Sequence, residues 1–208
     1  MSEHTNWTDG ENYLKKTDKN LAALIDKYGH CTLLPVAREK YYITLIKCIL
    51  SQQVASDVFQ RIFSVFTASY GENPSPDAIL AAPASEVEAC GVSRLKINYI
   101  KDLSRHIIEG KIDPSKFSQM SDAAIVKQLT EIKGLGRWTA EIFLILALNR
   151  PDVLPADDFG LQKAIKEVFS LPAVMQKRSQ MMAFAEKWRP WRSLATWYLW
   201  REFDGGRR

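Results

Sequence analysis

The 208-residue sequence predicts an all-helical fold, and three observations support this prediction. Apolar residues recur at three- and four-residue intervals along nearly every segment, which is the period of an amphipathic helix. No segment shows the convincing apolar–polar alternation that is typical of a half-buried strand. Glycines and prolines fall between the periodic segments, where they end helices.

In the first half of the chain, apolar stripes predict a series of helices, most of which end near a glycine or a proline. The longer helices carry the stripes at 21–28, 42–50, 54–66 and 95–107, and short helices are expected around 77–82 and 85–90. The first dozen residues are polar, and we expect them to be loose.

In the second half, Ser121 is suited to cap a helix that carries apolar residues at 125, 129 and 132. A glycine-rich turn at 133–137 leads into a helix over about 138–149, and the next helix runs over about 157–169. Another helix passes through Met181 and Trp188 to Pro190, and a last one begins near Trp191. Residues 205–208 are expected to be loose.

Composition is that of a soluble globular protein, with 46% hydrophobic and 25% charged residues. The net charge of +4 is compatible with a polyanionic partner but does not identify one. The three cysteines are odd in number and widely spaced, so we expect no disulfide framework and no zinc or iron–sulfur ligand set. The lack of a disulfide framework favours a reducing, intracellular compartment. The N-terminus is polar and acidic, so it is not a secretory signal, and no apolar run reaches membrane length.

One short turn combines glycines with flanking charges; it consists of Lys133, Gly134, Leu135, Gly136 and Arg137. The glycines permit positive φ and carry no Cβ that would keep a phosphate away, and the leucine can anchor the turn in the core. Backbone N–H groups beside a helix N-terminus favour an anion, so the turn is suited to gripping a DNA backbone. On its glycines alone, an ordinary helix–helix turn without a ligand fits equally well.

Two adjacent carboxylates, Asp157 and Asp158, stand at the start of the helix expected over about 157–169. Taken in isolation, one of them would cap the helix and the other would lie in its favourable first turn. On that basis alone, capping is the better interpretation and catalysis the weaker one.

Together these motifs resemble the signature of the helix-hairpin-helix DNA glycosylase superfamily, which includes endonuclease III and 3-methyladenine DNA glycosylase II. The resemblance runs from about Leu21 to the last helix, and its best-matched segments are 51–53, 132–140, 155–164 and 189–193. It implies one glycosylase unit over 1–208, built as two helical lobes around a DNA-binding cleft with the hairpin and Asp158 at its mouth. One lobe spans about 40–150, and the N-terminal helices join about 151–208 in the other.

The resemblance implies that Asp158 is the catalytic carboxylate and leaves Asp157 as the better cap. Breaking an N-glycosidic bond produces an oxocarbenium-like sugar, which a carboxylate stabilises while it orients or deprotonates the attacking water. Lyase members carry a lysine after the hairpin that attacks the sugar, and here Trp138 occupies that place. A monofunctional enzyme without strand cleavage is therefore implied, and without an iron–sulfur cluster, since no cysteine follows Cys90.

A tryptophan directly after the hairpin resembles the pattern of the alkylpurine branch of the superfamily. Members of this branch hold a flipped base with aromatic side chains. Purines alkylated at N3 or N7 are cationic, and an aromatic face attracts a cation by roughly 0.5–2 kcal/mol. The candidates for this base pocket are Trp138, Trp191 and Phe159. The remaining tryptophans of the C-terminal region are assigned to the core: Trp188, Trp197 and Trp200.

A flipped base leaves a gap in the duplex, and the resemblance implies that Gln53 fills it. Ser93 is a candidate for a second wedge on the opposite strand, and Arg94 and Lys96 would then contact the DNA backbone. The alternative is that Gln53 merely ends a helix and that Arg94 and Lys96 belong to a solvated helix start.

Three alternatives stay open. Ile142 stands where the bacterial 3-methyladenine DNA glycosylase II carries a further pocket aromatic, which leaves room for a glycosylase acting on deaminated or oxidised bases. A non-catalytic helix-hairpin-helix DNA-binding protein, or an unrelated helical interaction protein, would not need Asp158.

The predicted partner is double-stranded DNA containing damaged bases, bound by a monomer. No cofactor is required, although the family allows a Na⁺ or K⁺ ion at the hairpin backbone of Lys133 and Leu135.

Overall fold

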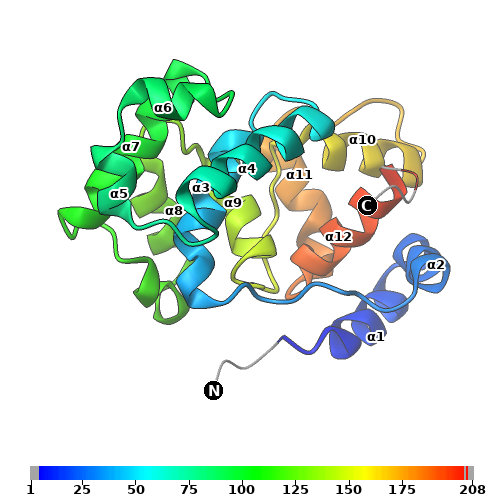
Figure 1. The fold of residues 1–208 in the computed structure, drawn as a ribbon. Coiled ribbons are helices and arrows are strands. Elements are labelled where there is room, and N and C mark those ends of the chain that lie inside the picture. The colour runs from blue at the N-terminus through cyan, green and yellow to red at the C-terminus, as the bar shows by residue number, and fades with distance from the viewer. Residues whose placement is uncertain (1–4, 204, 206–208) are drawn as a thin grey trace. The chain divides into compact units, whose positions relative to one another are not determined.

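A computed structural model of the protein describes residues 5–203 and residue 205, and every regular element within them is a helix (Figure 1). This confirms the predicted all-helical class. The helices are α1 (Trp7–Thr17), α2 (Lys19–Tyr28), η1 (Arg38–Lys40), α3 (Tyr41–Ser51), α4 (Ser56–Tyr70), α5 (Pro76–Ala81), α6 (Ala84–Ala89), α7 (Arg94–Ile108), η2 (Pro114–Gln119), α8 (Asp122–Thr130), α9 (Arg137–Leu146), α10 (Phe159–Val168), α11 (Arg178–Phe184), η3 (Ala185–Trp188) and α12 (Arg192–Phe203). None of the described helices combines the length and apolar character that crossing a bilayer requires.

The chain divides into two compact units. Val36–Phe143 forms the middle unit, and the chain up to Pro35 together with the chain from Leu144 forms the terminal unit. In the terminal unit, the blue helices α1 and α2 lie beside α12, which comes from the red end of the chain (Figure 1). Segments far apart in the sequence therefore share one core.

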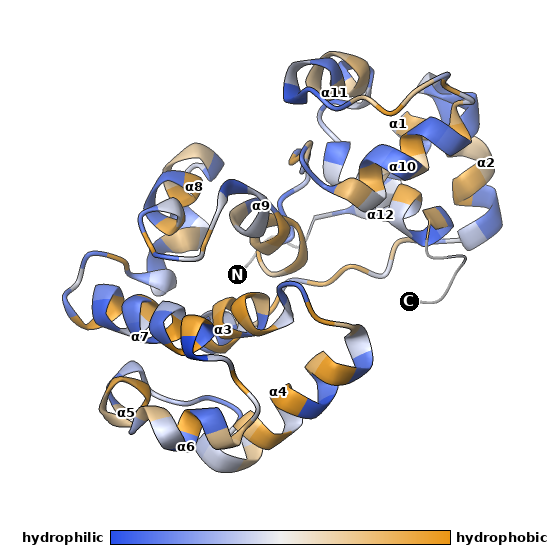
Figure 2. Cartoon of the chain, turned by 90° about the horizontal axis from the view of Figure 1, so that it is seen from above, coloured by the Kyte–Doolittle hydropathy of each residue, from blue (hydrophilic) through white to orange (hydrophobic). Residues whose placement is uncertain are grey.

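α3 is the central helix of the middle unit. Leu45, Ile46, Ile49 and Leu50 are fully buried in it, and Figure 2 shows the helix as a mostly hydrophobic element. α7 packs on α3 with an apolar stripe at Ile97, Ile100 and Leu103. Seven of the eleven residues of α3 are buried, which explains why this helix is more apolar than a surface helix.

α12 is the central helix of the terminal unit, but it buries polar groups as well as apolar ones. The Arg192 guanidinium donates two charge-assisted hydrogen bonds, of 2.6 and 3.0 Å, to the Asp152 carboxylate. The Ser193 hydroxyl accepts from the Val153 N–H at 2.9 Å. Buried polar groups need such partners. These bonds anchor the loop that leads from residue 151 to α10 on a rigid helix.

α1 contradicts the expectation that the first dozen residues are loose. The Asn6 side chain caps the helix, and the Trp7 and Leu14 side chains are buried. The helix was missed because its buried face also includes Gly10 and Glu11, so it shows no clean apolar stripe. Residues 1–4 and 206–208, which fall within the segments expected to be loose, lie outside the described residues.

Several predicted boundaries also shift. α9 ends at Leu146 instead of near Asn149, whose backbone is left-handed with a φ of 56°. The helix predicted from about residue 157 begins at Phe159, and the single helix predicted through Met181 and Trp188 is α11 followed by the 3₁₀ helix η3. Such shifts of a few residues arise because helix ends are decided by local capping.

Candidate functional site

The predicted hairpin lies in the middle unit, between α8 and α9. Gly134 has a φ of 83°, and a Cβ at this position would lie 2.1 Å from the Tyr99 ring, so only glycine fits. Gly136 differs, because its φ is not positive and a Cβ there would meet open space. Leu135 is buried, as predicted, while the Lys133 and Arg137 side chains are exposed.

Two side chains from other helices brace the hairpin. Gln52, at the end of α3, donates its amide to the Gly134 carbonyl at 2.8 Å. Asp102 of α7 accepts the Lys133 N–H at 3.0 Å. Sequence motifs do not reveal these roles, although an acidic residue on the buried face of α7, directly before Leu103, is a signal that Asp102 has a partner inside the protein.

The bracing decides which backbone groups of the hairpin can meet a phosphate. The N–H of Lys133 is occupied by Asp102, and that of Leu135 donates to the Ile132 carbonyl at 3.1 Å. These two N–H groups are therefore not available to a phosphate, and α9 begins two residues further along the chain, at Arg137.

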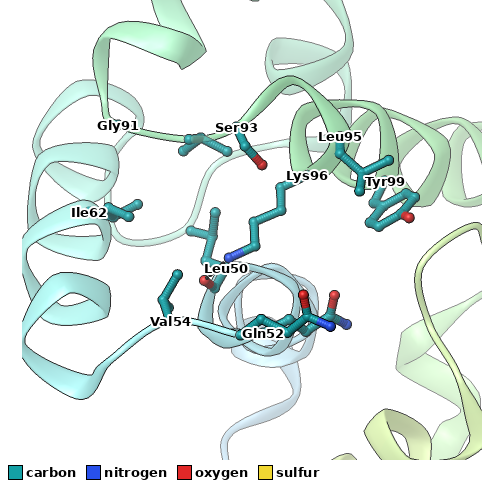
Figure 3. A pocket seen from close by; sticks show the side chains of 11 residues that line it. Leu50, Gln52, Val54, Ile62, Gly91, Ser93, Leu95, Lys96 and Tyr99 are labelled. Atoms are coloured by element: carbon teal, nitrogen blue, oxygen red, sulfur yellow. Dashed lines mark hydrogen bonds between the residues drawn. The ribbon is translucent and has the colours of Figure 1, made fainter.

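Gln53 and Ser93 line the same pocket of the middle unit, which has a volume of about 320 Å³ (Figure 3). Gln53 follows α3 in a left-handed conformation with a φ of 53°, and its side chain is exposed. Ser93 occupies the N-cap position of α7, yet its side chain makes no capping hydrogen bond. The structure thus brings the two predicted DNA-contacting side chains together at one surface.

Arg94 and Lys96 both have partners within the protein. Arg94 pairs with Glu88 at 2.5 Å on the surface. The Lys96 ammonium donates to the Leu50 carbonyl at 2.7 Å, which ties α7 to α3, and burial lowers the pKa of its amino group. Their contacts with a DNA backbone stay a prediction.

Asp158 lies in the terminal unit, at the N-cap position of α10. Its Oδ1 accepts the Leu161 N–H at 2.7 Å and the indole N–H of Trp200 at 2.9 Å. The assignment of the cap to Asp157 is therefore wrong, because Asp157 instead pairs with Arg178 at 3.0 Å. A carboxylate has about four lone-pair sites, so capping the helix does not prevent it from acting on a substrate.

The surroundings of Asp158 are crowded on the side of α10 and α12. A Cβ added at Gly160 would lie 3.3 Å from Asp158 Oδ1 and 3.3 Å from the Phe203 ring. The Gln162 amide donates to the Ala156 carbonyl at 2.8 Å and closes the preceding loop against the helix. The position of Gly160 therefore leaves little room for a larger residue beside the carboxylate, and the Gln162 bond fixes the loop that precedes it.

The three base-pocket candidates have different surroundings. Trp138 is 38% exposed at the start of α9, and Phe159 is 63% exposed with the Lys163 ammonium 4.5 Å from its ring centre. Trp191 is partly buried and lies edge-on to Trp7, with their ring centres 6.3 Å apart. Packing against α1 is thus an established role of Trp191, and its base-pocket role stays a prediction.

The assignment of Trp200 to the core was incomplete. Trp188 and Trp197 are buried as expected, whereas Trp200 is only partly buried and bonds Asp158. No sequence pattern links residues 158 and 200, because their contact depends on how α10 packs on α12.

The predicted residues fall into two groups. Asp158, Phe159 and Trp191 belong to the terminal unit. The middle unit contains the hairpin, Trp138, Gln53 and Ser93. The helices of each unit therefore position the predicted residues of that unit.

Comparisons with known proteins match most of the chain. Residues 46–190 match the model of the HhH-GPD superfamily base excision DNA repair protein. The alkylbase DNA glycosidase-like protein mag2 of Schizosaccharomyces pombe is 30% identical over 97% of this chain and 96% of its own length. DNA-3-methyladenine glycosylase 1 of the same organism is 32% identical over 95% of this chain and 88% of its own length.

A solved structure agrees with these sequence matches. It is a 3-methyladenine DNA glycosylase of Schizosaccharomyces pombe in complex with abasic DNA, which is 31% identical to this chain. The match covers 93% of this chain and 95% of that chain with a TM-score of 0.82. The chain described above therefore belongs to the HhH-GPD superfamily of base excision DNA repair proteins.

Proposed function

We propose that the protein is a monofunctional DNA glycosylase that removes alkylated purines of the 3-methyladenine and 7-methylguanine type from duplex DNA. The observation that carries the proposal is the carboxylate of Asp158, held by Leu161 and Trp200 directly before α10. Relatives named as 3-methyladenine DNA glycosylases support the class of lesion. Such an enzyme acts where the cell keeps its DNA, and we expect it to act as a monomer.

The proposed chemistry uses Asp158 as an electrostatic partner and a base. When the bond between C1′ and the purine nitrogen breaks, its electron pair leaves with the base and positive charge develops on the sugar. The carboxylate stabilises this charge and orients a water molecule that attacks C1′. An alkylated purine is already cationic and leaves as a neutral base, so no strong general acid is required.

The proposed grip on DNA uses the hairpin. The exposed Lys133 and Arg137 would contact phosphates beside the first turn of α9, where the helix dipole favours an anion. Such contacts fix the position of the protein without reading sequence. Gln53 would fill the place of the flipped base and pair with the orphaned partner through its amide.

Aromatic side chains would hold the flipped cationic base. Trp138 and Phe159 are both exposed to solvent, and the Lys163 ammonium beside the Phe159 ring would have to move away before a cationic base could stack there. Each cation–aromatic contact is worth roughly 0.5–2 kcal/mol. Flipping itself costs a few kcal/mol and costs least at a damaged pair, which adds to selectivity.

The absence of lyase activity is proposed from residue type. Strand cleavage by this chemistry needs an amine that attacks C1′ and forms a Schiff base. The indole of Trp138 is not nucleophilic enough to take that role.

A monovalent cation at the hairpin is proposed as a structural aid. The part of the chain that the structure describes contains no cluster of three His, Cys, Asp or Glu side chains that could hold a metal. A Na⁺ or K⁺ ion would instead rest on the main-chain carbonyls of Lys133 and Leu135, and carbonyl oxygens suit hard cations. The carbonyl of Gly134 already accepts from Gln52.

The test is base release from methylated duplex DNA by the parent protein, Asp158→Asn and Asp157→Asn. Asparagine caps a helix about as well as aspartate, so Asp158→Asn should fold, and Asp157→Asn changes an exposed residue that pairs with Arg178. We expect the parent to release 3-methyladenine or 7-methylguanine without nicking the strand. Asp158→Asn should bind DNA but release base about 10²-fold or more slowly. Asp157→Asn is the matched control and should retain the parent rate.

The other outcomes separate the alternatives. A parent protein that binds DNA and releases neither base overturns the alkylpurine assignment, and release from deaminated or oxidised duplexes would then identify the lesion. Equal loss in both aspartate variants would contradict the role of Asp158. A parent protein that binds DNA and releases no base from any duplex would be a binding protein without catalysis.

A further inference from the structure

The Asp158 carboxylate is held from two directions. The Leu161 N–H belongs to the same helix that Asp158 caps, at 2.7 Å from Oδ1. The Trp200 indole N–H comes from α12, at 2.9 Å from the same oxygen. α10 and α12 pack closely within the terminal unit, so the two donors are fixed relative to each other.

The two donors have different effects on the carboxylate. The capping bond is made by N-cap residues in general and restrains the side chain from one helix only. A donor on another helix restrains it from a second direction. The indole N–H can only donate, so a carboxylate oxygen is a suitable partner for it. Bonds to an ionised acceptor are also stronger than neutral ones.

Trp200 packs against the core of the terminal unit, and other residues also anchor α12. The start of this helix is already held by the paired Arg192 and Asp152 and by the Ser193 hydroxyl. The central part of the helix is buried in the core of the terminal unit. The bond from the Trp200 N–H to Asp158 is therefore an addition to contacts that already hold α12.

We propose that Trp200 is a positioning residue for Asp158, whose indole N–H holds the carboxylate in the orientation from which it stabilises the cationic sugar. This inference rests on the proposed function in one respect, namely that Asp158 is the carboxylate that faces the reacting sugar. It does not depend on which damaged base is removed.

Two substitutions separate the N–H from the ring. Trp200→Phe keeps an aromatic ring and removes the donor. Trp200→His keeps a donor, because the imidazole Nε2 stands at the same bond separation from Cβ as the indole Nε1. The neighbouring Asp158 carboxylate raises the pKa of the imidazole above its unperturbed value of about 6.5, so the assays are made at both pH 8 and pH 9 to favour the neutral form. Trp197→Phe is the matched control: Trp197 lies on the same helix, is buried, and stacks edge-on with Tyr198.

The primary measurement is binding to two duplexes, each with an abasic analogue. One contains a pyrrolidine, which is cationic, and the other contains a neutral tetrahydrofuran. The affinity ratio of the two duplexes reports the carboxylate–cation interaction and needs no turnover. We expect the parent to bind the cationic duplex more tightly than the neutral one, and Asp158→Asn to bind both equally. In Trp200→Phe, the affinity ratio of the cationic to the neutral duplex should fall about tenfold. Trp200→His should stay within about threefold of the parent, and Trp197→Phe should match it.

Single-turnover base release provides the second readout, with thermal unfolding recorded for each variant. Trp200→Phe should slow release without weakening binding to the neutral duplex, and adding it to Asp158→Asn should cause no further loss. The proposal is overturned if Trp200→Phe keeps the parent preference, or if Trp200→His falls as far as Trp200→Phe. It is also overturned if neither Trp200 variant is folded at the assay temperature, because Trp200 then only stabilises the fold.

Failure of the proposed function gives a different pattern. If the parent prefers the cationic duplex but releases no alkylated base, the alkylpurine assignment is wrong. The binding comparison of the Trp200 variants still tests the positioning role in that case. A parent without any Asp158-dependent preference for the cationic duplex contradicts the Trp200 inference itself.

Discussion

At the scale of single residues, the backbone of Gln53 is held in an unfavourable conformation. Its φ of 53° lies in the left-handed region, which costs a residue with a Cβ roughly 1 kcal/mol or more. Such strain persists only where the surroundings enforce it. Here the neighbouring Gln52 side chain is bonded to the hairpin and holds the turn.

Gln53→Gly should separate stability from function. Glycine accepts the left-handed backbone without strain, so the free energy of unfolding should stay the same or rise by up to about 1 kcal/mol. Affinity for a duplex with an abasic site should fall several-fold, because the amide that fills the gap is gone. Denaturant unfolding and DNA titration measure the two quantities.

Ser170 provides the matched control for this experiment. It is exposed and has a φ of 50°, and it lies outside the candidate site. Ser170→Gly should change stability in the same direction and leave DNA binding unaltered. Unaltered DNA binding in Gln53→Gly would contradict the gap-filling role.

At the scale of elements, the two glycines of the hairpin should respond differently to alanine. Gly134→Ala forces a Cβ into the Tyr99 ring in a left-handed conformation, and we expect a loss of about 2 kcal/mol or more of unfolding free energy. Gly136→Ala meets open space, so the fold should tolerate it. Its new methyl group would instead stand where a phosphate must approach the first turn of α9.

The measurements are thermal unfolding and affinity for undamaged duplex at fixed salt, because phosphate contacts are salt-dependent. Gly136→Ala should keep the melting temperature of the parent and bind DNA several-fold more weakly. Parent-like binding by this variant would mean that the turn does not approach a phosphate closely.

Elements with a one-sided apolar stripe could be predicted from the sequence, because burial of one face is what organises them. α2 and α7 are examples. α1 could not be predicted, since its stability comes from docking Trp7 and Leu14 into a core that is completed by α12, far away in the sequence.

The same contrast holds for the candidate site. The hairpin and Asp158 were identified because their motif lies in one continuous segment of the chain. The braces supplied by Gln52 and Asp102, and the bond from Trp200 to Asp158, join residues that only the packing of helices brings together. Local capping also decided which aspartate begins α10.

At the scale of the whole molecule, two buried carboxylates hold the terminal unit together. Glu11 of α1 accepts from the Cys31 N–H at 2.7 Å and from the Tyr198 hydroxyl of α12 at 2.8 Å. Asp18 caps α2 and also accepts the Trp188 indole N–H at 3.0 Å and the Lys187 ammonium at 2.7 Å. Each carboxylate joins an N-terminal helix to the C-terminal segment.

Both carboxyl groups have a lowered pKa in the folded protein. Burial alone would raise the pKa of Glu11, but the bonds from Cys31, His30 and Tyr198 bring it below the usual value of 4.5. Burial would likewise raise the pKa of Asp18, and the bonds from Lys187 and Trp188 bring it below 3.8. The unfolded chain therefore binds protons at a higher pH than the folded chain does.

These directions determine how stability depends on pH. The stability that each carboxylate contributes is fully present above its unfolded pKa and is lost as the pH falls through its folded pKa, so unfolding should become easier below about pH 4.5.

Glu11→Gln keeps an acceptor for Cys31 and Tyr198 but removes the charge. We expect it to lower the free energy of unfolding by about 1 kcal/mol at pH 7, and the difference from the parent should shrink toward pH 3. Denaturant unfolding across this range, with Asp26→Asn at an exposed ion pair as control, measures the effect. A difference that stays constant with pH would mean that the charge of Glu11 does not couple α1 to the C-terminal core.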